Sequence, residues 1–164
     1  MKTLLLIRHA KSSWEQVGQS DIDRPLNERG KKDAPEMAKR LKDKGLKIDR
    51  FVSSPAKRAR STAKYFAKEY DVKKDDIRLV EELYMASPAA FAEAIAMLDN
   101  VHDTVALFAH NPGISEFAAT LTEVKVDDMP TCAVFAVQVD TGSWSEFNNA
   151  EKKFLFFDYP KNEK

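Results

Sequence analysis

Residues 3–9 read Thr-Leu-Leu-Leu-Ile-Arg-His, an unbroken apolar run that ends at a charged residue and a histidine. A continuous apolar segment of this length is typical of a strand that is buried on both faces of a parallel sheet. Thr104–Ala109 repeats the pattern and also runs into a histidine, His110. Neither run approaches the roughly 20 apolar residues of a membrane-spanning helix. These two stretches predict the centre of a parallel sheet.

Further short apolar runs alternate with segments of helical periodicity. The expected strands cover residues 50–53, 77–80, 133–139 and 153–157, and the expected helices begin after Asn27, at Ser54-Pro55, at Ser87-Pro88 and after Pro112. We therefore expect a three-layer α/β/α sandwich with a mostly parallel central sheet. The turn-rich residues 140–143 predict a hairpin that adds an antiparallel edge. The length predicts one domain over residues 1–160, with a polar tail at 161–164.

The charge balance and the cysteine content exclude several classes of protein. Lys and Arg number 26, and Asp and Glu number 26, so the net charge of the 164 residues is zero. A neutral chain has no overall field to attract nucleic acid or an anionic membrane, and we expect neither as a partner. Cys132 has no second cysteine to pair with and is expected to be a small buried residue. Without a signal-peptide pattern, a cytoplasmic location is the expectation.

Polar residues at the strand ends point to phosphate chemistry. Ligands of open α/β sheets bind beyond the carboxyl ends of the strands, so Arg8-His9, Ser53-Ser54 and His110-Asn111 should share one rim. Arginines and histidines without an acidic cluster predict a pocket that holds a tetrahedral oxyanion, most simply phosphate, with no metal and no cofactor. A neutral histidine in such a pocket can attack phosphorus. His9 is well placed to do so.

Three motifs resemble the signatures of a known family. They are Leu-Ile-Arg-His-Ala at 6–10, Ser-Ser-Pro-Ala-Lys-Arg-Ala-Arg-Ser-Thr at 53–62 and Ala-His-Asn-Pro at 109–112. Together they resemble the histidine phosphatase (phosphoglycerate mutase-like) superfamily. The stretch Asp-Arg-Pro-Leu-Asn-Glu-Arg-Gly at 23–30 is most similar to its small SixA-like phosphohistidine phosphatases. The resemblance implies a phosphoglycerate mutase-like fold.

The resemblance also implies roles for individual residues. His9 would carry the phosphoryl group, while Arg8, Arg58 and His110 would bind that group and stabilise its charge. Water would then hydrolyse the His9 adduct. Glu82 resembles a family glutamate and would either protonate a leaving group or anchor the pocket through an arginine.

The chain departs from the family pattern at two places. It lacks the Gly-rich segment in which mutase relatives carry their acid, and this favours phosphohistidine because a phosphoramidate leaving group departs more readily than an alkoxide. Glu15 stands where many relatives use an asparagine near the phosphate. Arg24 suits either an ion pair with Asp21 or Asp23, or a rim contact with substrate.

The sequence therefore predicts a metal-independent phosphatase that acts on phosphohistidine of a signalling protein, such as a histidine phosphotransfer domain. A small phosphomonoester is the alternative substrate, and a module that binds phosphorylated partners without turnover is the alternative function. The short chain and the absence of extra basic residues for a bisphosphate disfavour a mutase. Trp14 and Tyr84 are expected to pack beneath their loops rather than to line the pocket mouth.

Overall fold

The computed structural model describes residues 1–14 and 18–162. Within these residues six strands form one sheet, in the order β3-β2-β4-β1-β5-β6. Their bounds are β1 Lys2–Arg8, β2 Arg50–Ser53, β3 Arg78–Leu79, β4 Thr104–Ala109, β5 Val134–Val139 and β6 Lys152–Asp158. The first four strands of that order run parallel, whereas β5 pairs antiparallel with both β1 and β6. The expected mostly parallel sheet with an antiparallel edge is confirmed.

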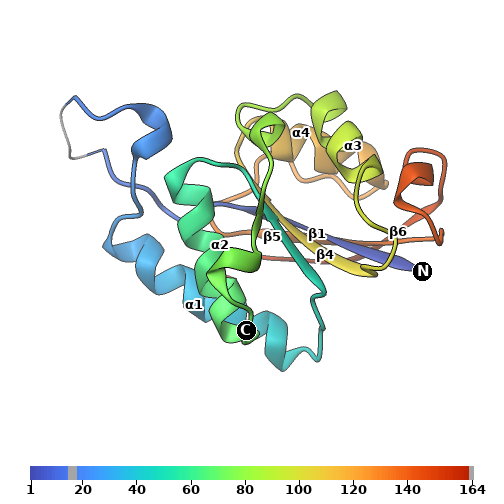
Figure 1. Cartoon of the computed structure of the whole chain (residues 1–164), viewed down its shortest axis with the longest axis horizontal. Helices are drawn as coiled ribbons and strands as arrows, with labels where there is room; N and C mark the ends of the chain where they lie inside the picture. The colour runs from blue at the N-terminus through green and yellow to red at the C-terminus, as the bar shows by residue number, and fades with distance from the viewer. Residues whose placement is uncertain (15–17, 163–164) are drawn as a thin grey trace.

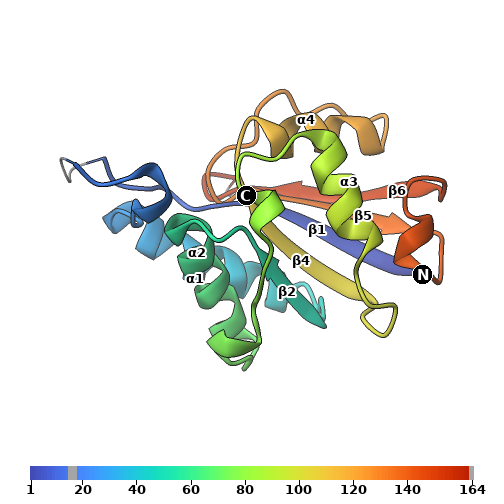
Figure 2. The same cartoon turned by 45° about the horizontal axis from the view of Figure 1, so that its top comes forward.

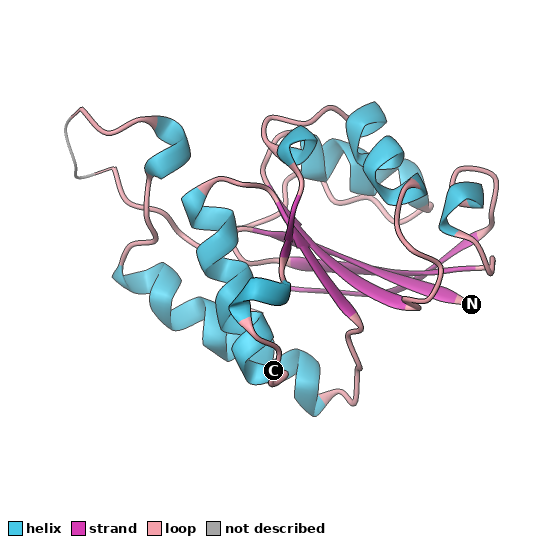
Figure 3. Ribbon diagram, viewed as in Figure 1, coloured by secondary structure: helices cyan, strands magenta, loops and turns pink. Residues whose placement is uncertain are grey.

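Helices cover both faces of the sheet. They are α1 Glu28–Asp43, α2 Lys57–Glu69, α3 Pro88–Ala96 and α4 Gly113–Leu121. α1 and α2 lie on one face and α3 and α4 on the other (Figures 1 and 2), and Figure 3 shows the strands between the two layers of helices. The three-layer α/β/α sandwich is therefore confirmed. In the described part of the chain, no helix has the length and the apolar character needed to cross a membrane.

β1 shows why the opening apolar run has no polar interruption. Side chains alternate between the two faces of a strand. Leu4 and Leu6 join the core beneath α3 and α4, whereas Leu5 and Ile7 join the core beneath α1 and α2. All four side chains are fully buried, and each burial of this kind contributes about 1.5–3 kcal/mol. The strand can end in polar residues only where it leaves the two cores.

The helices begin largely where the sequence predicts. The side chains of Asn27 and Ser87 cap α1 and α3. The expected start of α2 at Ser54 is wrong, because the helix begins at Lys57. The Ser54 hydroxyl accepts the N–H of Ala56, and Ala56 keeps an extended ψ of 138°. The segment before α2 is thus a turn that serves the site described below.

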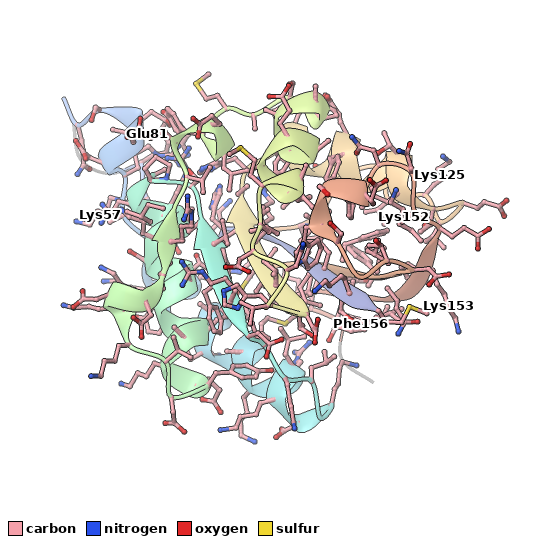
Figure 4. All side chains as sticks on the ribbon, turned by 45° about the vertical axis from the view of Figure 1, so that its right-hand side comes forward. Lys57, Glu81, Lys125, Lys152, Lys153 and Phe156 are labelled. Atoms are coloured by element: carbon pink, nitrogen blue, oxygen red, sulfur yellow. The ribbon has the colours of Figure 1, made fainter. Side chains whose placement is uncertain are left out.

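The hairpin that the sequence predicts between the last two strands is present, because β5 and β6 pair antiparallel. Residues 140–151 form a longer connection that buries Trp144, whose Nε1 donates to the His102 carbonyl at 2.7 Å. Burial of the indole stabilises this connection because it removes a large apolar surface from water. β6 is an edge strand, and Lys152 and Lys153 project from it at one side of the molecule (Figure 4). Charged residues of this kind protect an edge from pairing with another chain.

Candidate active site

The sheet register brings three strand ends together. Arg8 pairs with Ala109 across β1 and β4, and Ser53 pairs with Phe108 across β2 and β4. The residues that follow these strands therefore leave the sheet at one edge. The rings of His9 and His110 lie 5.2 Å apart between centroids, at an interplanar angle of 52°. The convergence that the sequence predicts is present.

His9 is held as a neutral ring with a defined tautomer. Its Nδ1 lies 2.7 Å from the Ala10 carbonyl, which can only accept, so Nδ1 carries the proton and Nε2 has a free lone pair. Burial lowers the pKa of His9 to about 3; the Ala10 hydrogen bond opposes this effect, and the charges of Arg58 and Arg8 add to it. His9 is therefore a neutral ring with an available nitrogen lone pair near neutral pH.

His110 is fixed by the segment before α2. Its Nε2 lies 2.7 Å from the Ser54 hydroxyl. Its ring packs against that of Tyr84 in a T-shaped arrangement, with 5.7 Å between the ring centroids. The pKa of His110 is lowered to about 3, mainly by burial and further by the neighbouring His9 and Arg58. Nδ1 of His110 and Nε of Arg8 are buried without a hydrogen-bond partner among the described residues. The Nε–H of Arg8 can donate to a ligand oxyanion, and Nδ1 of His110 can do so in the tautomer in which Nε2 accepts from the Ser54 hydroxyl.

Two arginines lie beside the histidines. Arg8 donates from Nη1 to the Met129 carbonyl at 2.7 Å. Arg58, only 6% exposed, stands in the first turn of α2 and donates to the backbone carbonyl and the carboxylate of Asp21 at 2.7 and 3.0 Å. Thr62, one turn further along α2, accepts the N–H of Ala10 at 2.9 Å. This bond ties the helix that carries Arg58 to the backbone beside His9.

An unexpected turn supports the backbone of the same pair. The N–H of Cys132 donates to the carbonyls of Arg8 and His9 at 3.1 and 3.0 Å, and Cys132 adopts a left-handed φ of 62° to do so. The expected burial of Cys132 is confirmed, and burial raises the pKa of its thiol. The cysteine therefore acts through its backbone and its small apolar side chain.

These groups open into one cavity of about 720 Å³. Its lining residues include Arg8, His9, Lys11, Ser12, Trp14, Asp21, Arg24, Arg58, Met85, His110, Asn111, Glu116 and Thr131. Among the described residues, the lining has four basic side chains against two acidic ones. An excess of arginine and lysine next to neutral histidines suits an anion, and the planar guanidinium groups suit a phosphoryl group in particular.

Asp21 has a larger part in this site than the ion pair with Arg24 that the sequence predicts. Arg24 and Arg58 both donate to its carboxylate at 3.0 Å, and the Tyr84 hydroxyl donates at 2.5 Å. The hydrogen bond from Tyr84, with those from the two arginines, lowers the pKa of Asp21 to about 2. The ion pair foreseen between Arg24 and Asp21 is present, and Arg24 also lines the cavity. The expectation that Trp14 packs beneath its loop is wrong, since its side chain is 76% exposed.

Glu82 is not brought to this cavity. The short 3-10 helix η3 (Glu81–Leu83) buries Leu83 and leaves Glu82 exposed, lining a second cavity with Arg50 and Arg78. Glu15 lies outside the described residues. Of the five residues expected to act in catalysis, the structure therefore gathers His9, Arg8, Arg58 and His110, and places Glu82 elsewhere.

The fold and the site together define a phosphatase of the histidine type. The chain belongs to the Histidine phosphatase superfamily (branch 1), whose sequence profile matches residues 4–86.

Solved structures and curated relatives agree with this assignment. The SixA protein of Agrobacterium tumefaciens is 25% identical and superposes with a TM-score of 0.81, over 97% of this chain and 98% of that one. The protein histidine phosphatase SixA complexed with tungstate is 22% identical, with a TM-score of 0.82 over 99% of each chain, and shows the same fold. Phosphoserine phosphatase 1 of Hydrogenobacter thermophilus is 44% identical over 85 residues, which are 49% of this chain and 39% of that enzyme.

Proposed function

We propose that the protein hydrolyses phosphohistidine on a signalling protein, through a phosphoenzyme formed on Nε2 of His9. The observation that carries this proposal is the neutral His9 ring, whose free Nε2 lies in a cavity with Arg8, Arg58 and His110. The proximity of these side chains to one another supports the proposal, because groups that are held together before binding lower the cost of orienting them in the transition state.

The first chemical step transfers the phosphoryl group. Nε2 of His9 attacks phosphorus, and the bond between phosphorus and the substrate nitrogen breaks with its electron pair going to the substrate ring. When the other nitrogen of that ring is protonated, the substrate imidazole leaves as a neutral molecule. Arg8, Arg58 and His110 stabilise the negative charge that spreads over the phosphoryl oxygens.

The second step returns the enzyme to its resting state. Water attacks phosphorus, the bond to Nε2 breaks, and the water protons remain with phosphate, so His9 regains its neutral form. The first step therefore needs a good leaving group on the substrate, whereas the second step needs only water.

The carboxylates of the site favour a phosphoramidate over an alkyl phosphate. Among the described residues, Asp21 and Glu116 are the acidic side chains that line the cavity. Asp21, with its pKa of about 2, is a carboxylate at neutral pH and has no proton to give to an alkoxide. An imidazole leaving group does not depend on such a proton. Glu82 lines the second cavity, so it has no part in protonating the leaving group.

The test compares variants on two substrates after EDTA treatment. His9→Ala should abolish turnover of a phosphohistidine peptide, and Arg58→Ala should reduce kcat by roughly 10²–10³-fold, the usual effect of removing one charge-stabilising group. Arg60→Ala is the matched control, since Arg60 lies on the same helix but donates to the Pro55 carbonyl outside the cavity. Faster turnover of para-nitrophenyl phosphate than of phosphohistidine would shift the substrate to a phosphomonoester. Phosphate binding without turnover of either substrate would indicate a module that binds phosphorylated partners without hydrolysing them.

A further inference from the structure

Two large apolar side chains lie exposed at the mouth of the active-site cavity. Trp14 is 76% exposed and Met85 is 82% exposed, and both line the cavity that contains His9. Single exposed apolar residues are common on protein surfaces, but tryptophan and methionine are enriched where proteins meet. Their position beside a catalytic cavity calls for a functional explanation.

A series of contacts leads from Trp14 to Tyr84, the residue that precedes Met85. The indole ring of Trp14 covers the guanidinium group of Arg24, with 3.2 Å between the Arg24 Cζ and the ring centroid. Arg24 donates to Asp21, and Asp21 accepts from the hydroxyl of Tyr84, the residue before Met85. We call these five residues the mouth arch. Stacking on a hydrogen-bonded arginine holds an exposed ring in one orientation.

The Met85 end of the mouth arch is also fixed. Met85 has a left-handed φ of 56°, which is costly for a residue other than glycine. The next residue, Ala86, packs its carbonyl against Gly113, where a Cβ would collide with it. The segment is therefore held in a strained conformation by contacts on both sides, and this conformation directs an unbranched apolar side chain into solvent.

We propose that Trp14 and Met85 bind an apolar surface of the folded protein that carries the phosphohistidine, and thereby select phosphoproteins over small phosphoramidates. This inference rests on the proposed function. A free phosphohistidine would satisfy the arginines and histidines inside the cavity and leave the exposed ends of the mouth arch without a partner. Lys11 and Glu116, which line the same cavity, carry opposite charges and so favour neither an acidic nor a basic partner surface. Apolar contact is therefore the better basis for selecting the phosphoprotein.

The experiment measures kcat/KM on a phosphorylated histidine phosphotransfer domain and on phosphoramidate, the smallest substrate with the same P–N bond. Trp14→Ala and Met85→Gln should each lower kcat/KM for the phosphoprotein by about tenfold, as expected for an interface anchor. Both variants should keep kcat/KM for phosphoramidate within about twofold of the wild-type value. Met97→Gln is the matched control, because Met97 is 86% exposed but lines the second cavity.

The remaining outcomes separate this inference from the proposed function. An unchanged phosphoprotein kcat/KM in both variants overturns the inference. Equal losses on both substrates overturn it as well, because they would show that the mouth arch acts only by holding Arg24 and Asp21. If the wild type turns over neither substrate, the proposed function itself fails. Met85→Gln keeps the test valid if Trp14→Ala disturbs Arg24, since the side chain that stacks on Arg24 is that of Trp14.

Discussion

The chemistry of His9 depends on one hydrogen bond and on its surroundings. The Ala10 carbonyl fixes the proton on Nδ1 and leaves the lone pair of Nε2 available. Burial, with the charges of Arg58 and Arg8, keeps the ring unprotonated. A protonated imidazole cannot act as a nucleophile, so the arginines that we propose bind the phosphoryl group also favour the unprotonated ring that the proposed mechanism needs.

A pH titration by NMR tests this arrangement. His9 and His110 have pKa values lowered to about 3, so both rings should remain neutral from neutral pH down to about pH 5. Long-range ¹H–¹⁵N spectra should also show the His9 proton on Nδ1. Uptake of a proton by either ring between about pH 6 and 7, near the ordinary histidine pKa, would contradict the account.

At the scale of elements, close contacts between helices and strand exits hold the motif residues in position. Thr62 ties α2 to Ala10, and Gly30 lets α1 approach the backbone that follows His9. A Cβ at Gly30 would collide with the carbonyl oxygen of Lys11. That carbonyl also accepts the N–H of Asn27 at 3.0 Å, so the start of α1 and the exit of β1 form one packed unit.

Replacing Gly30 with alanine should expose this packing in a stability measurement. Alanine is the better helix former by about 1 kcal/mol, yet the clash should dominate and lower the free energy of unfolding by about 1–3 kcal/mol. Urea unfolding of Gly30→Ala against wild type measures the change. Gly142→Ala is the control, because nothing lies within 4 Å of its added Cβ and it should have little effect. A Gly30→Ala variant as stable as wild type would refute the packing argument.

For the whole molecule, the sequence predicts the parts of the site that follow from sheet topology. Buried strands that each end in a polar residue place His9 and His110 on one edge, and α2 adds Arg58. Contacts between distant loops have no such local signal. The bond between Asp21 and Tyr84 joins residues 63 positions apart, and the sequence pattern gives no sign of it.

The position of Glu82 is a second feature that the sequence pattern does not predict, and here the cause lies within a single turn. Its neighbour Leu83 is apolar and is drawn fully into the core, which leaves the glutamate outside the cavity. A family position in the sequence does not fix the direction of a side chain in a turn of three residues. The direction depends on which neighbour the core buries.

The measurement that tests the central claim most directly is the location of the phosphoryl group on the enzyme. Wild-type protein mixed with phosphoramidate and quenched in alkali should carry acid-labile phosphate on His9, identified by mass spectrometry, with ³¹P NMR placing it on Nε2. His9→Ala should carry none. Turnover without a labelled enzyme, or label on His110 or on Nδ1 of His9, would contradict the proposed mechanism.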